Sequence, residues 1–225
     1  MSALVALTAQ NTVAVTDVFE VPPEFVVAQL DALFDDLGAD AAKTGMLFSR
    51  ALIETVADYL AAHPVPLVVD PVMVASSGAR LLQKDAVASY VERLFPLATV
   101  VTPNLHEAEV LAGGPGPAGE LAVRIHELGA PAVVVTGGHG VLRGDTFYDG
   151  RELVLVETER HDVRATHGSG CTHSATLAAH LARGESLLEA VRAAALAASD
   201  AVAHGLTELG AGEGPVDVLH VKGAR

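Results

Sequence analysis

Short apolar runs alternate with longer amphipathic segments along most of the chain. Strand-length runs predict strands at residues 3–9, 41–46, 66–69, 98–102 and 132–135. Helical periodicity predicts helices at residues 22–37, 49–62, 84–95, 105–112, 120–128, 174–183 and 186–204. This alternation is typical of βαβ units, so we expect an α/β fold in which helices cover both faces of a mostly parallel sheet.

Local signals refine this pattern. The Asp149-Gly150 pair lies between two β-rich runs and predicts a hairpin within residues 141–162, which would form a small antiparallel flap. Ser49 is expected to cap the helix that follows it, and Ser186 with Glu189 matches a capping box for the last helix. Residues 216–220 are expected to add a final short strand.

The composition indicates one globular domain over residues 1–225, because no linker rich in Pro, Gly or Ser divides it. Hydrophobic residues make up 50% of the chain, yet no apolar run is long enough to cross a bilayer. The N-terminus does not resemble a secretory signal, and a single cysteine excludes a disulfide framework. We therefore expect a cytoplasmic protein that does not contact the membrane.

The charge of the chain restricts its partners. A formal net charge of −14 at pH 7 disfavours binding to nucleic acid or to anionic membranes, and the Lys and Arg residues form no cluster. An anionic substrate would have to be bound by local groups, such as helix N-termini, a metal ion or Lys43. We expect small-molecule partners and no nucleic acid.

Polar residues stand at the ends of five successive predicted strands: Gln10, Lys43, Asp70, Asn104 and Thr136. Each of them alone is more often a turn former than a functional residue. Because parallel strands of an α/β sheet place their carboxyl ends at one edge, where ligands bind, we expect the five side chains to converge there.

Two carboxylates in this set suit a hard cation. Asp70 stands at a strand tip, and Glu107 lies in the first turn of a helix beside Asn104. Mg²⁺ is commonly bound by one or two carboxylates together with water and substrate phosphates, so these residues favour a magnesium site. The alternative is structural, with Asp70 in a turn before Pro71 and Glu107 complementing a helix N-terminus.

A glycine-rich turn at residues 166–173 is the most distinctive stretch of the chain. Gly168 and Gly170 allow backbone N–H groups at the start of a helix to face an anion, and Ser169 and Cys171 lie in the same turn. The alternatives are a helix-capping loop with a buried thiol, or a Cys/His hydrolase with Cys171 as nucleophile. His167 and His173 flank the thiol, but their spacing is not that of a zinc site.

Six motifs in a fixed order resemble those of the hydroxymethylpyrimidine and phosphomethylpyrimidine kinases. They are Leu7 to Thr12, Lys43 to Leu47, Asp70 to Met73, Thr102 to Glu109, Gly137 to His139 and Thr166 to Cys171. The resemblance implies a ribokinase-like three-layer α/β/α domain. It also implies ATP- and Mg²⁺-dependent phosphorylation of 4-amino-5-hydroxymethyl-2-methylpyrimidine and of its monophosphate, a step in thiamine biosynthesis.

The resemblance assigns roles to individual residues. Gln10 and Met46 would contact the pyrimidine, and Asp70, Asn104 and Glu107 would hold Mg²⁺. The remaining implied site residues are Thr136, Gly138 and Thr166 beside the nucleotide, and Gly168, Ser169, Gly170 and Cys171 in the anion hole. Cys171 stands where sugar-kinase relatives have a catalytic aspartate, and a thiol pKa lowered by the helix terminus would make it a general base.

The chain also departs from the family pattern. An N-terminal βα unit with a glycine-rich loop is expected to be missing, and Thr136, Ser169 and His106 replace the Lys, Thr and Pro of many relatives. A pyridoxal-type kinase of the same superfamily and a catalytically impaired pyrimidine-binding or regulatory fragment therefore stay open as alternatives. Relatives are commonly dimers, so a homodimer is expected.

Overall fold

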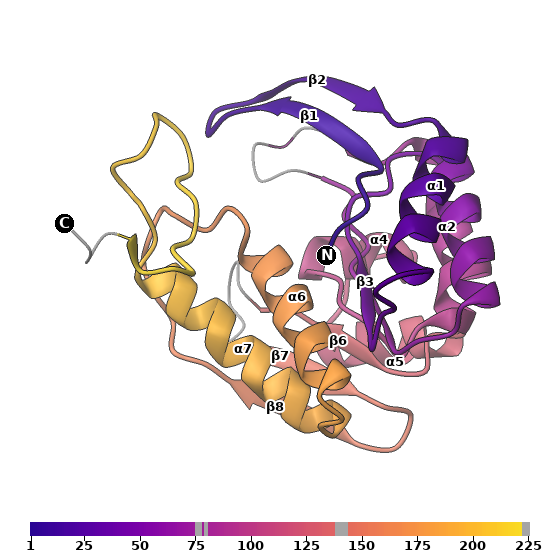
Figure 1. The fold of residues 1–225 in the computed structure, drawn as a ribbon. Helices are drawn as coiled ribbons and strands as arrows, with labels where there is room; N and C mark the ends of the chain where they lie inside the picture. Colours follow the sequence, from indigo (N-terminus) through magenta and orange to yellow (C-terminus); the bar gives the residue numbers. More distant parts are fainter. Residues whose placement is uncertain (75–77, 79–80, 138–143, 222–225) are drawn as a thin grey trace.

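The computed structural model describes residues 1–74, 78, 81–137 and 144–221, and its centre is a six-stranded sheet in the order β3-β4-β5-β6-β7-β8. The strands are β3 (Ala42–Thr44), β4 (Leu67–Val69), β5 (Val100–Val101), β6 (Val133–Val135), β7 (Gly144–Tyr148) and β8 (Leu153–Glu157). Strands β3 to β6 are parallel, and β7 is antiparallel to both of its neighbours. Each strand therefore pairs with the strand that precedes it in the sequence (Figure 1).

Both faces of this sheet are buried. Val69 and Val101 pack into the core on one face, whereas Val68, Val100 and Val134 pack into the core on the other. Because side chains alternate along a strand, a run of β-branched residues can fill both cores at once. The continuous valine runs of the central strands are explained by this double burial.

Helices form the two outer layers. One face is covered by α1 (Pro23–Phe34), α2 (Arg50–Ala62), α4 (Leu105–Leu111) and α5 (Ala118–Glu127), and the other by α6 (Ser169–Ala182) and α7 (Leu187–Ala203). Figure 1 shows α6 and α7 on the side of the sheet opposite to α1 and α2. The predicted three-layer α/β/α architecture is therefore confirmed. Among the helices that the structure describes, none has the length and apolar character that a membrane span requires.

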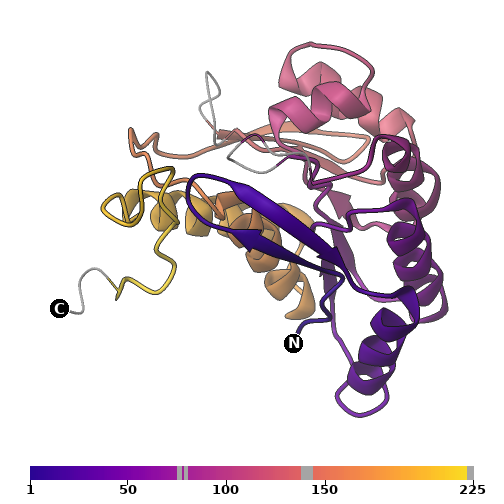
Figure 2. The ribbon, with the colours of Figure 1, turned by 90° about the horizontal axis from the view of Figure 1, so that it is seen from above.

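The first strand lies elsewhere than predicted. Strand β1 (Ala6–Gln10) pairs antiparallel with β2 (Val15–Glu20) in a separate two-stranded sheet (Figures 1 and 2). Leu7 is 47% exposed and Phe19 is 62% exposed, so the expectation of a buried strand at residues 3–9 is wrong. A short run of small apolar residues does not distinguish a buried strand from an exposed one.

The predicted hairpin forms, but not as a flap. Strands β7 and β8 pair antiparallel, with Tyr148 opposite Leu153 across the Asp149-Gly150 turn. Their Phe147 and Val156 side chains are buried against α6 and α7, so the hairpin extends the main sheet. The small antiparallel unit of the fold is instead the β1–β2 pair.

Some helix and strand boundaries also differ from the predictions. Residues 84–97 form a mixture of short 3₁₀, α and π turns, and Pro96 in the last of them has no N–H to continue an α-helix. No strand forms at residues 216–220, where Leu219 is 82% exposed; nearby, Pro215 makes one isolated parallel bridge with His167.

Helix capping follows the sequence only in part. The Ser49 hydroxyl accepts a hydrogen bond from the Leu52 N–H at 3.3 Å, as predicted. Ser186 does precede α7, but its hydroxyl donates to the Glu189 carboxylate at 2.6 Å and makes no side-chain cap, so the predicted capping box is incomplete. A complete capping box instead joins Asn104 and Glu107 at the start of α4.

A matched pair of leucines tests the α6–α7 layer. Leu177 on α6 is fully buried, whereas Leu196 on α7 is 64% exposed. We expect Leu177→Ala to lower the free energy of unfolding by about 2–5 kcal/mol, because it removes buried methyl groups and leaves a cavity. Leu196→Ala should change it by less than about 0.5 kcal/mol in the same urea titration. Equal losses in the two variants would contradict the packing described above.

Candidate active site

The predicted site residues meet in one cavity of ≈ 710 Å³ at the carboxyl ends of the parallel strands. The expected residues that line it are Gln10, Lys43, Met46, Asp70, Asn104, Glu107, Thr136, Thr166, Gly168, Ser169, Gly170 and Cys171. The predicted convergence of the five side chains is therefore confirmed, although Gln10 comes from the separate β1–β2 sheet and not from a parallel strand. Gly138, the other expected nucleotide contact, lies outside the described residues.

The glycine-rich turn becomes the first turn of α6. Gly168 is the N-cap and has φ 91°, a left-handed conformation that favours glycine. Ser169 to Cys171 are the first helical residues, so the helix begins earlier than the predicted residue 174. The first turn of a helix carries N–H groups that lack intrahelical acceptors, and it is the positive end of the helix dipole. This end of α6 faces the cavity and is suited to an anion.

Asp70 is a buried carboxylate between the sheet and α6. It follows β4 directly and is only 5% exposed, and its Oδ2 accepts a hydrogen bond from the Ser174 hydroxyl of α6 at 2.9 Å. Burial raises the pKa of Asp70, while the charges of Lys43 and His173 and the Ser174 hydrogen bond oppose that rise. The carboxylate is therefore short of compensating positive charge, which a cation in the cavity would supply.

Glu107 is held in one orientation by the backbone. Its Oε1 accepts from the Met73 N–H at 3.1 Å, and its Oε2 accepts from the Asn104 N–H at 3.0 Å. Asn104 Oδ1 in turn accepts from the Glu107 N–H at 2.9 Å. Burial raises the pKa of Glu107 to about 8, and the Asp70 charge contributes to that rise. Two carboxylates whose pKa values are both raised by burial fit a divalent cation with oxygen ligands.

The pKa of the Cys171 thiol differs from the expectation. The thiol lies in the first turn of α6 and is exposed within the cavity. Loss of hydration raises its pKa, Lys43 opposes that rise, and Asp70 and Glu107 add to it. The expected lowering of the thiol pKa by the helix terminus is therefore wrong for the ligand-free protein. Desolvation and the charges of Asp70 and Glu107 together outweigh the effects of Lys43 and of the Cys171 backbone N–H, which lower this pKa.

The remaining predicted residues lie at the borders of the cavity. Gln10 is an exposed residue of β1 at a register shift with β2, and Met46 is half-buried after β3. Thr136 continues β6 and bridges to Asn104, with its N–H donating to the Pro103 carbonyl at 2.9 Å. Thr166 Oγ1 lies 3.4 Å from Glu213 Oε2, a contact that links the glycine-rich turn to the C-terminal segment.

Lys43 was expected to bind an anionic substrate, whereas His173 and Asp145 were given no role at the site from the sequence. The charge of Lys43 acts to lower the pKa of both Asp70 and Cys171. In the sequence, Lys43 stood out as a basic residue at a strand end in an acidic chain. His173 is 3% exposed, and its Nε2 lies 3.0 Å from Asp145 Oδ2, although the two are not aligned for a hydrogen bond. Asp145 Oδ1 accepts from the Gly137 N–H at 2.9 Å, so this pair connects α6 to the loop after β6. No local pattern marked Asp145.

The fold and the cavity define an α/β protein of the class that binds phosphorylated small molecules where parallel strands end and a helix begins. A protein-family model described as phosphomethylpyrimidine kinase matches residues 1–217, and the chain belongs to this family. A hydroxymethylpyrimidine/phosphomethylpyrimidine kinase of Rhizobium meliloti is 47% identical over 232 residues, which cover 97% of this chain and 85% of the relative.

Solved structures of two kinases share the fold of this chain. A pyridoxal kinase of Bacillus subtilis, determined as an ADP complex, aligns with a TM-score of 0.88 and 35% identity over 99% of this chain and 87% of its own. A phosphomethylpyrimidine kinase of Clostridium difficile aligns with a TM-score of 0.74 and 31% identity over 87% of this chain and 83% of its own. These matches confirm the predicted ribokinase-like fold.

The raised pKa of Glu107 predicts a pH dependence of stability in metal-free protein. The folded carboxyl has a pKa of about 8 against an ordinary value of 4.5. The folded state binds this proton more tightly than the unfolded state. The contribution of Glu107 to the free energy of unfolding is therefore complete below about pH 4.5 and is lost as the pH rises through about 8. We expect Glu107→Gln to remove that part of the decline, measured by urea unfolding with a chelator at several pH values. Glu120→Gln, on a side chain that is 63% exposed, is the control and should keep the wild-type slope.

Proposed function

We propose that this chain transfers a phosphoryl group from ATP to 4-amino-5-hydroxymethyl-2-methylpyrimidine and then to its monophosphate, in the cytoplasm and as a step of thiamine biosynthesis. The observation that carries the proposal is the convergence of the family's motif residues on one cavity, with carboxylates on one side and the start of α6 on the other. ATP would supply the phosphoryl group, and Mg²⁺ held by Asp70 and Glu107 would neutralise charge on its phosphates. The chain's own residues bind and position these groups.

The start of α6 is the proposed phosphoryl site. The N–H groups of Gly170 and Cys171 lie in its first turn, whereas the Ser169 N–H donates to the Thr166 carbonyl at 3.1 Å. Gly168 brings the backbone into the required conformation. Preorganised N–H donors stabilise charge that develops on a transferred phosphoryl group without reorganising during the reaction. Lys43 faces this region and adds a mobile positive charge.

Asp70 and Glu107 are the proposed carboxylates of the Mg²⁺ site. The burial of Asp70 and the raised pKa of both groups support this role, because a divalent cation would offset their repulsion. Asn104 is also implied at this site. Its side-chain oxygen caps α4 through the Glu107 N–H, so in this geometry we propose that Asn104 chiefly positions Glu107.

Other residues of the cavity wall would contact the pyrimidine and the adenine nucleotide. Gln10 offers an amide donor and acceptor to an aminopyrimidine, and Met46 offers an apolar contact to its ring. Thr136 and Thr166 border the region proposed for the nucleotide. The family's usual homodimer is a further expectation, and sedimentation equilibrium tests it directly.

Pyridoxal phosphorylation is the second candidate, favoured by the structural match to the Bacillus subtilis pyridoxal kinase. The carboxylates and the anion site would serve either substrate. The two functions therefore differ in the ring contacts, where Gln10 suits the exocyclic amine and ring nitrogen of the pyrimidine.

An activity assay with hydroxymethylpyrimidine, its monophosphate and pyridoxal separates the candidates. We expect turnover of both pyrimidines, and Gln10→Ala should lower kcat/KM for hydroxymethylpyrimidine by roughly 10–100-fold through the lost hydrogen bonds. Gln83→Ala is the control, since Gln83 is exposed and does not line the cavity. Turnover of pyridoxal alone would reject the pyrimidine assignment.

Substitution of Cys171 tests its implied role as general base. Phosphoryl transfer through a loose transition state needs little proton abstraction, and the raised pKa of the thiol makes it a poor base near neutrality. We therefore expect Cys171→Ser to retain kcat within about tenfold and to keep the shape of the kcat–pH profile. A loss of roughly 10²-fold or more, together with the disappearance of one limb of that profile, would support the base instead.

A further inference from the structure

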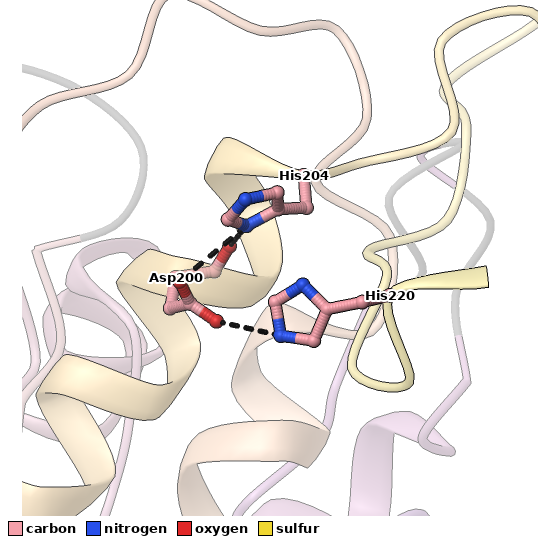
Figure 3. Close-up of side chains that lie close together, drawn as sticks. All are labelled: Asp200, His204 and His220. Carbon is pink, nitrogen blue, oxygen red and sulfur yellow. Dashed lines mark hydrogen bonds and ion pairs between the residues drawn. The ribbon is translucent and has the colours of Figure 1, made fainter. Parts of the chain in front are cut away.

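Three metal-ligating side chains meet on the surface at the end of α7, outside the cavity. Asp200 lies in the last turn of α7, His204 is its C-cap, and His220 reaches them from the C-terminal segment (Figure 3). Their side chains are 55%, 51% and 52% exposed. Within the part of the chain that the structure describes, no other group of three such side chains lies close enough to share an ion.

The spacing of the ligand atoms suits coordination. His204 Nδ1 lies 3.4 Å from Asp200 Oδ1, and His220 Nε2 lies 3.2 Å from Asp200 Oδ2. Ligand bonds of roughly 2.0–2.1 Å in a tetrahedral zinc site place neighbouring ligand atoms about 3.4 Å apart. All three ligand atoms lie within 4.8 Å of one another, so a small rotation of the exposed imidazoles would complete the arrangement.

The electrostatics of this helix end favour a cation. The carboxyl end of a helix carries partial negative charge, and Asp200 adds a full negative charge there. The last turn of α7 has no basic residue, and among the described residues the ion pairs of Asp200 involve only His204 and His220. Neutral histidines leave this charge uncompensated, whereas a bound divalent cation offsets both the carboxylate and the helix dipole.

The donor atoms identify the kind of cation. Two imidazole nitrogens and one carboxylate oxygen suit Zn²⁺ and similar first-row transition metals, whereas Mg²⁺ prefers oxygen ligands alone. The cavity offers the contrasting oxygen set of Asp70 and Glu107. The two groups should therefore select different cations.

We propose that Asp200, His204 and His220 form a zinc-binding site, with water completing the coordination. His204 Nδ1 lies 2.9 Å from the Asp200 carbonyl oxygen, so zinc binding at Nδ1 would replace that hydrogen bond, with the proton of the neutral imidazole carried on Nε2 instead. The ion would fasten the C-terminal segment to α7. That segment contributes Glu213 to the cavity wall and Pro215 to the bridge with His167. The zinc site would therefore stabilise the segment that packs against the glycine-rich turn.

Zinc titration of the full chain tests the proposal. The protein is freed of metal, carries Cys171→Ser to remove the thiol as a ligand, and is kept in excess Mg²⁺ to occupy the cavity carboxylates. Competition with a chromophoric chelator should give one Zn²⁺ per chain. Asp200→Asn and His220→Gln should each weaken zinc binding by roughly 10-fold or more. Loss of a partner that only hydrogen-bonds to a metal ligand already has an effect of that size.

His180→Gln is the matched control. His180 also pairs with one carboxylate, Glu185 at 2.7 Å, but belongs to no group of three ligands, so this variant should bind zinc as the parent does. Co²⁺ should give the visible absorption of a tetrahedral site in the parent and not in His220→Gln. Circular dichroism verifies that each variant is folded. The absence of saturable zinc binding, or equal affinity in the parent and both ligand variants, would overturn the proposal.

Discussion

The buried carboxylate of Asp70 is the constraint on which the rest of the site depends. It lies at the end of β4, and its hydrogen bond to Ser174 ties the central sheet to α6 across 104 residues of sequence. Burying a charge is costly unless it is hydrogen-bonded or paired, so Ser174, Lys43 and His173 must all be held near it. Their arrangement brings the positive end of α6 opposite the carboxylates. One buried negative charge thus fixes the geometry in which anion and cation sites face each other.

Most of the fold could be predicted because buried faces of strands and helices produce a periodic pattern of hydrophobic residues in the sequence. The valine runs of β4, β5 and β6 are buried on both faces, and the amphipathic helices between them require a parallel arrangement. The pattern failed where it does not show which strands join the main sheet. The apolar run of β1 resembles that of a core strand, yet its position is decided by pairing with β2. Likewise, the β7–β8 hairpin was visible locally, but its attachment to β6 was not.

The residues of the candidate site could be predicted from the sequence, but their pKa shifts and ion pairs could not. The parallel strand topology brings Lys43, Asp70, Asn104 and Thr136 to one cavity, so their convergence followed from spacing, whereas Gln10 reaches the cavity from the separate β1–β2 sheet. The raised pKa of Glu107 and of Cys171 comes from burial and from neighbours far away in sequence, which spacing does not reveal. The pairing of His173 with Asp145 was hidden for the same reason.

The strand order has a consequence for how the chain folds. Each strand of the main sheet is added beside the one made just before it, so the sheet can grow by short-range steps as the polypeptide is synthesised. Ser174 and the glycine-rich turn follow all six strands in the sequence. A nascent chain can therefore assemble its scaffold while Asp70 still lacks its α6 partner, and the phosphate-binding end is completed only when the last helices dock.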